Sequence, residues 1–136
     1  MSDIRPELSK SNSYRIPKHR YYELKHFVQQ YPDWDLAVVN IDSMVRSCRD
    51  HEGKITNVSD PVWKAVLKRS EYTKNIQLCK DIADDTDPVL GRTILQAIIL
   101  GESYDKIKAR TDIPCCKDVY YDLYHKFFWL LDAARK

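Results

Sequence analysis

The chain has 136 residues, enough for one domain or for two small helical modules that share a core. Nine Tyr, three Trp and three Phe stand against only three Gly, and this favours helices, because all-β chains use many glycines in tight turns. The net charge of +2 does not by itself indicate a nucleic-acid-binding protein, a class that is usually far more basic, and the lack of a long apolar run excludes a membrane span.

The N-terminal part is predicted to contain a tail and two helices. Residues 1–14 are polar and are expected to form a flexible tail. Pro17 can open a helix, which Tyr31-Pro32 ends, and Asp33 is a good cap for the next one. Because the connection is short, we expect residues 17–50 to form a helical hairpin.

A long helix is predicted over residues 61–85, after a loop in which Gly53 and Asn57 interrupt the pattern. Its apolar residues, among them Tyr72 and Ile76, recur by threes and fours, close to a heptad repeat. Two interpretations stay open: a core helix that lies on the hairpin, or a seam between two copies of the chain.

The acidic stretch from Asp84 to Asp87, followed by Pro88, predicts a module boundary. We divide the chain into a tail (1–14), an N-terminal helical module (15–86) and a C-terminal module (87–136). The C-terminal module is expected to hold three helices, the last over about 115–134. The predicted fold class is all-α: a hairpin plus a long helix, then a trihelical unit.

The stretch "SYDKIKARTDIPCCKDVYYDLYHKFF", residues 103–128, has the pattern of a helix-turn-helix. Such a motif needs inward apolar residues in the first helix, the turn and the second helix, and here Ile107, Ile113, Val119 and Leu123 take those places. Amphipathic helix pairs without any DNA-binding role match this pattern often.

If the motif binds DNA, its basic residues identify the contact surface. Phosphate contacts are expected from Lys106, Lys108, Arg110 and Lys117, and base contacts from Tyr121 and His125. A second basic patch lies near the N-terminus, and its members are Arg15, Lys18, His19, Arg20, Lys25 and His26. In either place the plain alternative is a solvated helix face.

Phe128 and Trp129 fall outside the apolar stripe of the last helix and are too large to leave in water. We expect them, with Tyr72 and Ile76, to form an interface. A homodimer is one solution, and folding of one module onto the other within the chain is nearly as good.

The order of spaced aromatics from "RYYELKHFVQQYPDW" to "YDLYHKFFWLLD" resembles the RinA/ArpU-type late-gene regulators of phages of Gram-positive bacteria. The resemblance covers about residues 15–133. It implies a transcriptional regulator with a helix-turn-helix like that of sigma-factor region 4, a recognition helix at 115–134, and promoter DNA and RNA polymerase as partners.

The sequence predicts no enzyme. It contains no phosphate-binding loop, nucleophile elbow or H-E-x-x-H motif, and its four cysteines lack the spacing of zinc ligands. No cofactor and no catalytic or metal-binding residue is therefore expected, and the expected location is the cytoplasm of a bacterial host. The alternative to a DNA-binding regulator is a small helical adaptor that binds protein, such as a packaging or assembly factor or an inhibitor of a host system.

Overall fold

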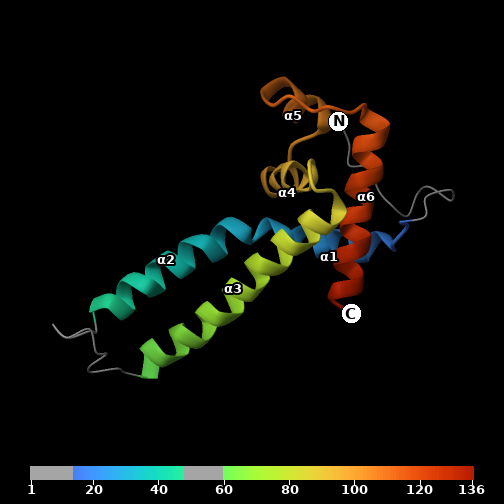
Figure 1. Cartoon of the computed structure of the whole chain (residues 1–136). Helices are drawn as coiled ribbons and strands as arrows, with labels where there is room; N and C mark the ends of the chain where they lie inside the picture. Colours follow the sequence, from blue (N-terminus) through green and yellow to red (C-terminus); the bar gives the residue numbers. More distant parts are fainter. Residues whose placement is uncertain (1–13, 48–59) are drawn as a thin grey trace. The chain divides into compact units, whose positions relative to one another are not determined.

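The computed structural model describes residues 14–47 and 60–136, and it is all-α over these residues. The tail predicted before Tyr14 and the loop predicted around Gly53 and Asn57 lie outside the described part. The helices are α1 (Lys18–Gln29), α2 (Tyr31–Ser47), α3 (Asp60–Thr86), α4 (Gly91–Leu100), α5 (Tyr104–Arg110) and α6 (Lys117–Ala134) (Figure 1). The predicted all-α class is confirmed for these residues.

The helices fall into two compact units. Unit 1 contains residues 14–30 and 79–136, and unit 2 contains the described residues of 31–78. This grouping differs from the boundary that we expected after residue 86, because α1 and the last residues of α3 belong with the C-terminal helices. It also differs from the expected hairpin of the first two helices, since α1 and α2 belong to different units.

Unit 1 is built around an aromatic core in which α1 packs on α4 and α6. The rings of Tyr21 on α1 and Phe128 on α6 meet edge to face, with centroids 4.9 Å apart. The hydroxyl groups of Tyr21 and Tyr124 are hydrogen-bonded at 2.7 Å inside the core. Two residues about a hundred positions apart in sequence therefore join the first helix of this unit to the last.

Local sequence chemistry explains where the helices of unit 1 begin and end. Asp87 accepts hydrogen bonds from the backbone N–H groups of Val89 and Leu90, so the acidic boundary does serve as a turn and cap. Gly101 ends α4 in the left-handed conformation, with φ of 68°. Ser103 then caps α5, as its side chain accepts a hydrogen bond from the backbone N–H of Lys106.

Unit 2 consists of α2 and the first part of α3, which run side by side (Figure 1). Arg69, which breaks the apolar pattern of α3, donates hydrogen bonds to both carboxylate oxygens of Asp42 on α2, at 2.5 and 3.4 Å. Only Trp34 and Ile41 are buried among the described residues of this unit, and both keep a few per cent of their surface exposed. The hydrophobic core of unit 2 is therefore thin.

Candidate nucleic-acid interface

Tyr104 fixes the position of α5 against the start of α6 within unit 1. Its hydroxyl donates a hydrogen bond to the carbonyl oxygen of Cys115 at 2.8 Å, and its backbone N–H donates one to the hydroxyl of Tyr121 at 3.2 Å. The Tyr104 ring also meets that of Tyr120, with centroids 5.2 Å apart. Two helices joined by a six-residue connection, 111–116, are thus held in one arrangement.

The inward residues expected of a helix-turn-helix agree with the structure in part. Ile107 and Ile113 are buried, as predicted. Val119 is 46% exposed, so its predicted inward position is wrong, and Leu123 is half-buried. The first turn of α6 therefore projects further from the core than the helical pattern indicated.

All four predicted phosphate contacts are exposed, on α5 and on the first residue of α6. Arg110 pairs with Glu102 at 2.9 Å, and Lys117 lies 3.8 Å from Asp105. The Lys108 ammonium lies 5.5 Å from the centre of the Tyr104 ring, and hydrogen bonding to the Tyr104 hydroxyl raises the pKa of this lysine. Lys108 is thus fully charged at neutral pH.

Tyr121 and His125, the two residues expected to contact bases, are less exposed than the four expected phosphate contacts. His125 is buried, with 8% of its surface exposed, and burial lowers the pKa of its imidazole. Its predicted place on the outer face of α6 is therefore wrong. Tyr121 is half-buried, and its hydroxyl already accepts the hydrogen bond from Tyr104.

The reason for this difference is that α6 is covered on more than one side. Phe127 and Leu131 are buried, and Tyr124 and Phe128 are buried as well, on the side where they meet Tyr21 of α1. His125, next to Tyr124, is also buried. Phe128 has no exposed surface because it packs against Tyr21 of α1, as expected if one module folds onto the other within the chain. The interface assigned to it is already formed within unit 1.

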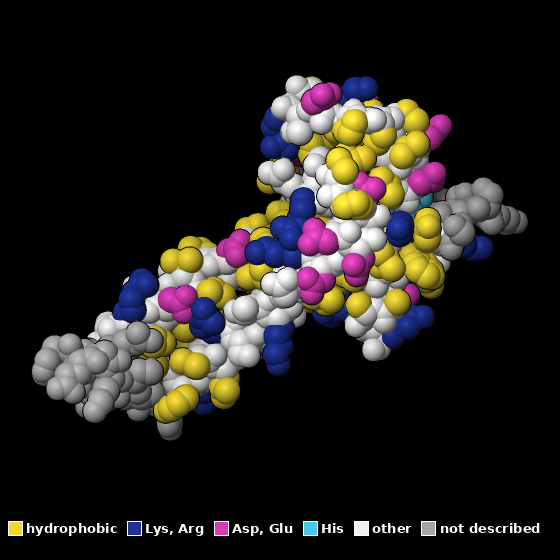
Figure 2. All heavy atoms as spheres, in the orientation of Figure 1, with side chains coloured by type: hydrophobic (Ala, Val, Ile, Leu, Met, Phe, Trp, Pro, Cys, Tyr) yellow, Lys and Arg dark blue, Asp and Glu magenta, His cyan; other side chains and the backbone are white. Residues whose placement is uncertain are grey.

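Trp129 is 42% exposed, and its ring meets that of Tyr14 with centroids 5.6 Å apart. Asp122 and Asp118, about two and three turns nearer the start of α6, are also exposed. The accessible face of α6 is therefore acidic and aromatic rather than basic. Figure 2 shows that Lys and Arg side chains are interspersed with Asp and Glu on the visible surface.

The second basic patch, on and before α1, is smaller than its sequence indicated. Arg20 donates a hydrogen bond to the Asp132 carboxylate at 2.7 Å and pairs with Glu23 at 3.2 Å. These bonds raise the pKa of Arg20 and give it a structural role between α1 and α6. Arg15, Lys18 and His19 are exposed there.

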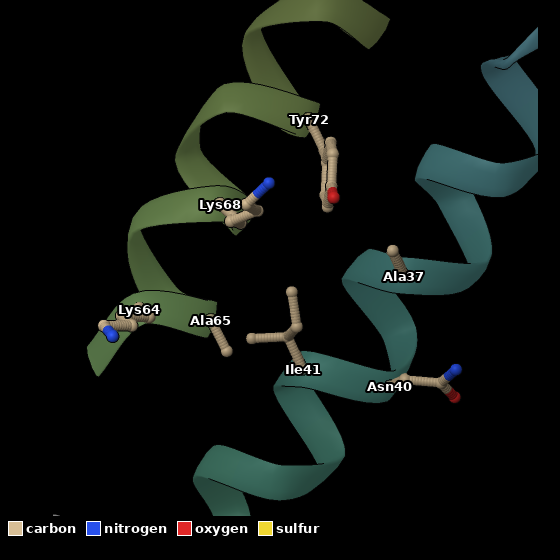
Figure 3. A pocket seen from close by; sticks show the side chains of 7 residues that line it. All are labelled: Ala37, Asn40, Ile41, Lys64, Ala65, Lys68 and Tyr72. Carbon is tan, nitrogen blue, oxygen red and sulfur yellow. The ribbon is translucent and has the colours of Figure 1, made fainter. Parts of the chain in front are cut away.

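The other two predicted interface residues, Tyr72 and Ile76, are half-buried in unit 2. Tyr72 lines a shallow groove of about 400 Å³ between α2 and α3 (Figure 3). The heptad pattern identified Tyr72 but not the other residues that line this groove. Leu36 and Leu67 do not fit the apolar stripes of their helices, and these two leucines, both exposed in the structure, could have indicated a further apolar surface.

Among the described residues, no group of three His, Cys, Asp or Glu side chains is placed to hold a metal ion, and Cys48 lies outside them. No helix in the described ranges has the length and apolarity required to cross a membrane. No protein-family model matches the sequence, and no curated protein or solved structure matches it either.

Proposed function

We propose that the chain is a DNA-binding transcriptional regulator that contacts the phosphate backbone of duplex DNA through α5 and the first residue of α6. The observation that carries this proposal is that four cations, Lys106, Lys108, Arg110 and Lys117, are all exposed on α5 and the first residue of α6. Exposed cations release counterions when they meet phosphates, and this release supplies most of the affinity of sequence-independent binding.

The ion pairs of Arg110 and Lys117 do not oppose this role. Both are exposed pairs, and such pairs contribute only about 0–1 kcal/mol in water. A phosphate oxygen can replace the carboxylate of Glu102 or Asp105 at little cost. Tyr104 meanwhile holds α5 in place, so the cations reach the DNA from a rigid element.

The acidic face of α6 limits how this surface meets DNA. Asp118 and Asp122 would be repelled by phosphates, so α5 rather than the middle of α6 approaches the backbone most closely. With His125 buried, Tyr121 is the one expected base contact that stays in the proposal. We therefore propose weak sequence selectivity and a promoter choice shared with RNA polymerase.

The resemblance to RinA/ArpU-type regulators supports a narrower form of the proposal, a phage late-gene regulator that acts in the bacterial cytoplasm. In this form, the helix-turn-helix consists of α5, the connection 111–116 and α6.

Fluorescence anisotropy with labelled duplexes from the parent genome tests the proposal. The double variant Lys108→Ala/Arg110→Ala should weaken binding to all duplexes alike and lower the slope of log affinity against log salt by up to about two. The comparison variant is Arg15→Ala/Lys18→Ala, which removes two exposed cations from the other basic patch.

A loss confined to the Arg15/Lys18 variant would move the DNA surface to α1. If the wild-type protein binds no duplex even at low salt, the DNA-binding proposal fails.

The second candidate is a helical adaptor that binds protein, and the exposed Trp129, on the same face of α6 as the exposed Asp122 two turns away, favours it. A helix face that offers an exposed aromatic ring and a carboxylate suits a protein partner better than a polyanion. Binding of purified host RNA polymerase provides the test: Trp129→Ala should weaken it at least several-fold, whereas Val89→Ala, which trims an apolar side chain with a larger exposed fraction, should not. Equal effects of the two variants would contradict the adaptor role of Trp129.

A further inference from the structure

The groove of unit 2 is an apolar surface with a positive rim. Its lining residues are Ala37, Asn40, Ile41, Lys64, Ala65, Lys68 and Tyr72, which include two lysines and no acid. Figure 3 shows Ile41 and Ala65 pointing toward each other at its floor, with Lys68 and Tyr72 extending from α3. An occupant should therefore offer apolar side chains flanked by carboxylates.

Large apolar side chains next to the groove lie in solvent. Leu36 is 62% exposed and precedes Ala37 on α2, and Leu67 is 69% exposed and lies between Lys64 and Lys68 on α3. Residues three and four apart are neighbours on a helix surface, so both leucines border the groove. Together with the thin core of unit 2, this exposure indicates that a further layer packs here.

The two helices of unit 2 carry opposite charge. In α2, three aspartates stand against one arginine, which gives −2, whereas residues 60–78 of α3 hold four cations and two acids, which gives +2. Asp33 lies seven residues before Asn40, on the same face of α2 as this groove residue. Since Leu36 lies between them on that face, α2 presents a leucine flanked by a carboxylate.

We propose that the groove binds α2 of a second copy of the chain, and that the second copy receives α2 of the first in the same way. Each α2, with Leu36 and Asp33, then lies on the other copy's α3 beside Lys64, Leu67 and Lys68. The contact is two-fold symmetric, and the two helical pairs form a four-helix layer. The opposite charges favour α2 on α3 and disfavour the pairing of like helices.

The occupant is a second copy because the chain itself carries the chemistry that the groove requires. Tyr72 belongs both to the interface predicted from the sequence and to this contact. Phe128 was also predicted at the interface, but it is buried in unit 1, and the exposed Leu36 and Leu67 supply the apolar surface instead. The proposal rests on unit 2 alone and is independent of DNA binding. An acidic amphipathic helix from another protein is the competing occupant.

Sedimentation equilibrium over a wide range of concentrations tests the proposal. The wild-type mass should rise with concentration from 16.0 kDa toward twice that value. Lys68→Glu should weaken association by about tenfold or more, because it places a carboxylate opposite Asp33. Adding Asp33→Lys to the same chain should restore association, since each contact then regains opposite charges.

Two matched variants separate this contact from general effects. Lys74→Glu makes the same charge change on α3 at an exposed residue outside the groove lining and should leave the association unchanged. Leu67→Ala should weaken association, whereas Val89→Ala, which removes a side chain that is 71% exposed in unit 1, should not. If Lys68→Glu lowers the helical circular dichroism signal, the association is measured with Lys68→Gln instead, which removes the positive charge without adding a negative one.

Three results would overturn the proposal. The first is a mass of 16.0 kDa at every concentration, which would leave the groove to another protein. The second is a dimer that Lys68→Glu and Lys74→Glu weaken equally. The third is a failure of Asp33→Lys to restore association in the Lys68→Glu chain while both variants stay helical.

Discussion

Gly91, the first residue of α4, is the position where the packing of unit 1 tolerates the least change. A Cβ atom added there would overlap the carbonyl oxygen of Ala83 on α3 and would lie 2.6 Å from its carbonyl carbon. Both atoms belong to the backbone, so no side chain can rotate away, and α4 would have to move by about an ångström. Overpacking of this kind costs about 1–3 kcal/mol, and the rigid backbone places Gly91→Ala at the upper end or beyond.

Helix propensity predicts the opposite sign for this substitution. Alanine is favoured over glycine within a helix by about 1 kcal/mol, so an α4 that did not touch α3 would be stabilised. Urea denaturation followed by circular dichroism distinguishes these two expectations, because the structure predicts a net loss of about 2 kcal/mol or more in the free energy of unfolding.

Gly101 supplies the control. It has φ of 68°, and no atom lies within 4 Å of an added Cβ, so Gly101→Ala should cost only the conformational strain, about 1 kcal/mol. A Gly91→Ala protein as stable as the wild type, or more stable than Gly101→Ala, would refute the close approach of α4 to α3.

Three further predictions concern buried groups of unit 1. Tyr21→Phe and Tyr124→Phe should each cost about 1 kcal/mol in urea denaturation; because both remove the same hydrogen bond, the double variant should cost less than their sum, and additivity would contradict the bond. Burial lowers the pKa of His125 below 6.5, so protons bind the unfolded chain more readily. The stability that His125 contributes is therefore complete above pH 6.5 and falls on acidification below it, by at most about 1.4 kcal/mol per pH unit, and a pH series of His125→Gln should lack this component. Burial raises the pKa of the Cys79 thiol to about 12, so a thiol reagent should label exposed Cys116 in the native protein and Cys79 only in urea; native labelling of Cys79 would contradict its burial.

Much of the secondary structure follows from short-range chemistry and could be predicted from the sequence. The long helix expected at 61–85 is α3, Asp60–Thr86, and the last helix expected at about 115–134 is α6, Lys117–Ala134. Ser103 caps α5, and Asp87 in the predicted boundary accepts a hydrogen bond from the backbone N–H of Leu90 in the turn before α4. These features depend on residues within one or two helical turns of each other, so a single sequence is enough to predict them.

The surface of α6 could not be predicted in the same way. A helical projection assigns one inward stripe, but the side of α6 that carries Phe128 faces α1, about a hundred residues earlier in the chain. His125 was therefore expected on the outer face and is buried instead, whereas Phe128, expected at an interface, has its partner in Tyr21 of α1 within the same chain. The ion pair of Arg20 with Asp132 has the same origin, since neither residue signals its partner locally.

The sequence by itself thus determined the all-α class, the bounds of α3 and α6 to within two residues, and the set of basic residues from which a DNA contact can be proposed. Only the tertiary structure decided which of those residues are accessible and which face of unit 2 is left open, as at Lys64 and Lys68 beside the groove. The physical reason is that helix formation depends on neighbours along the chain, whereas burial depends on which distant helices cover a face.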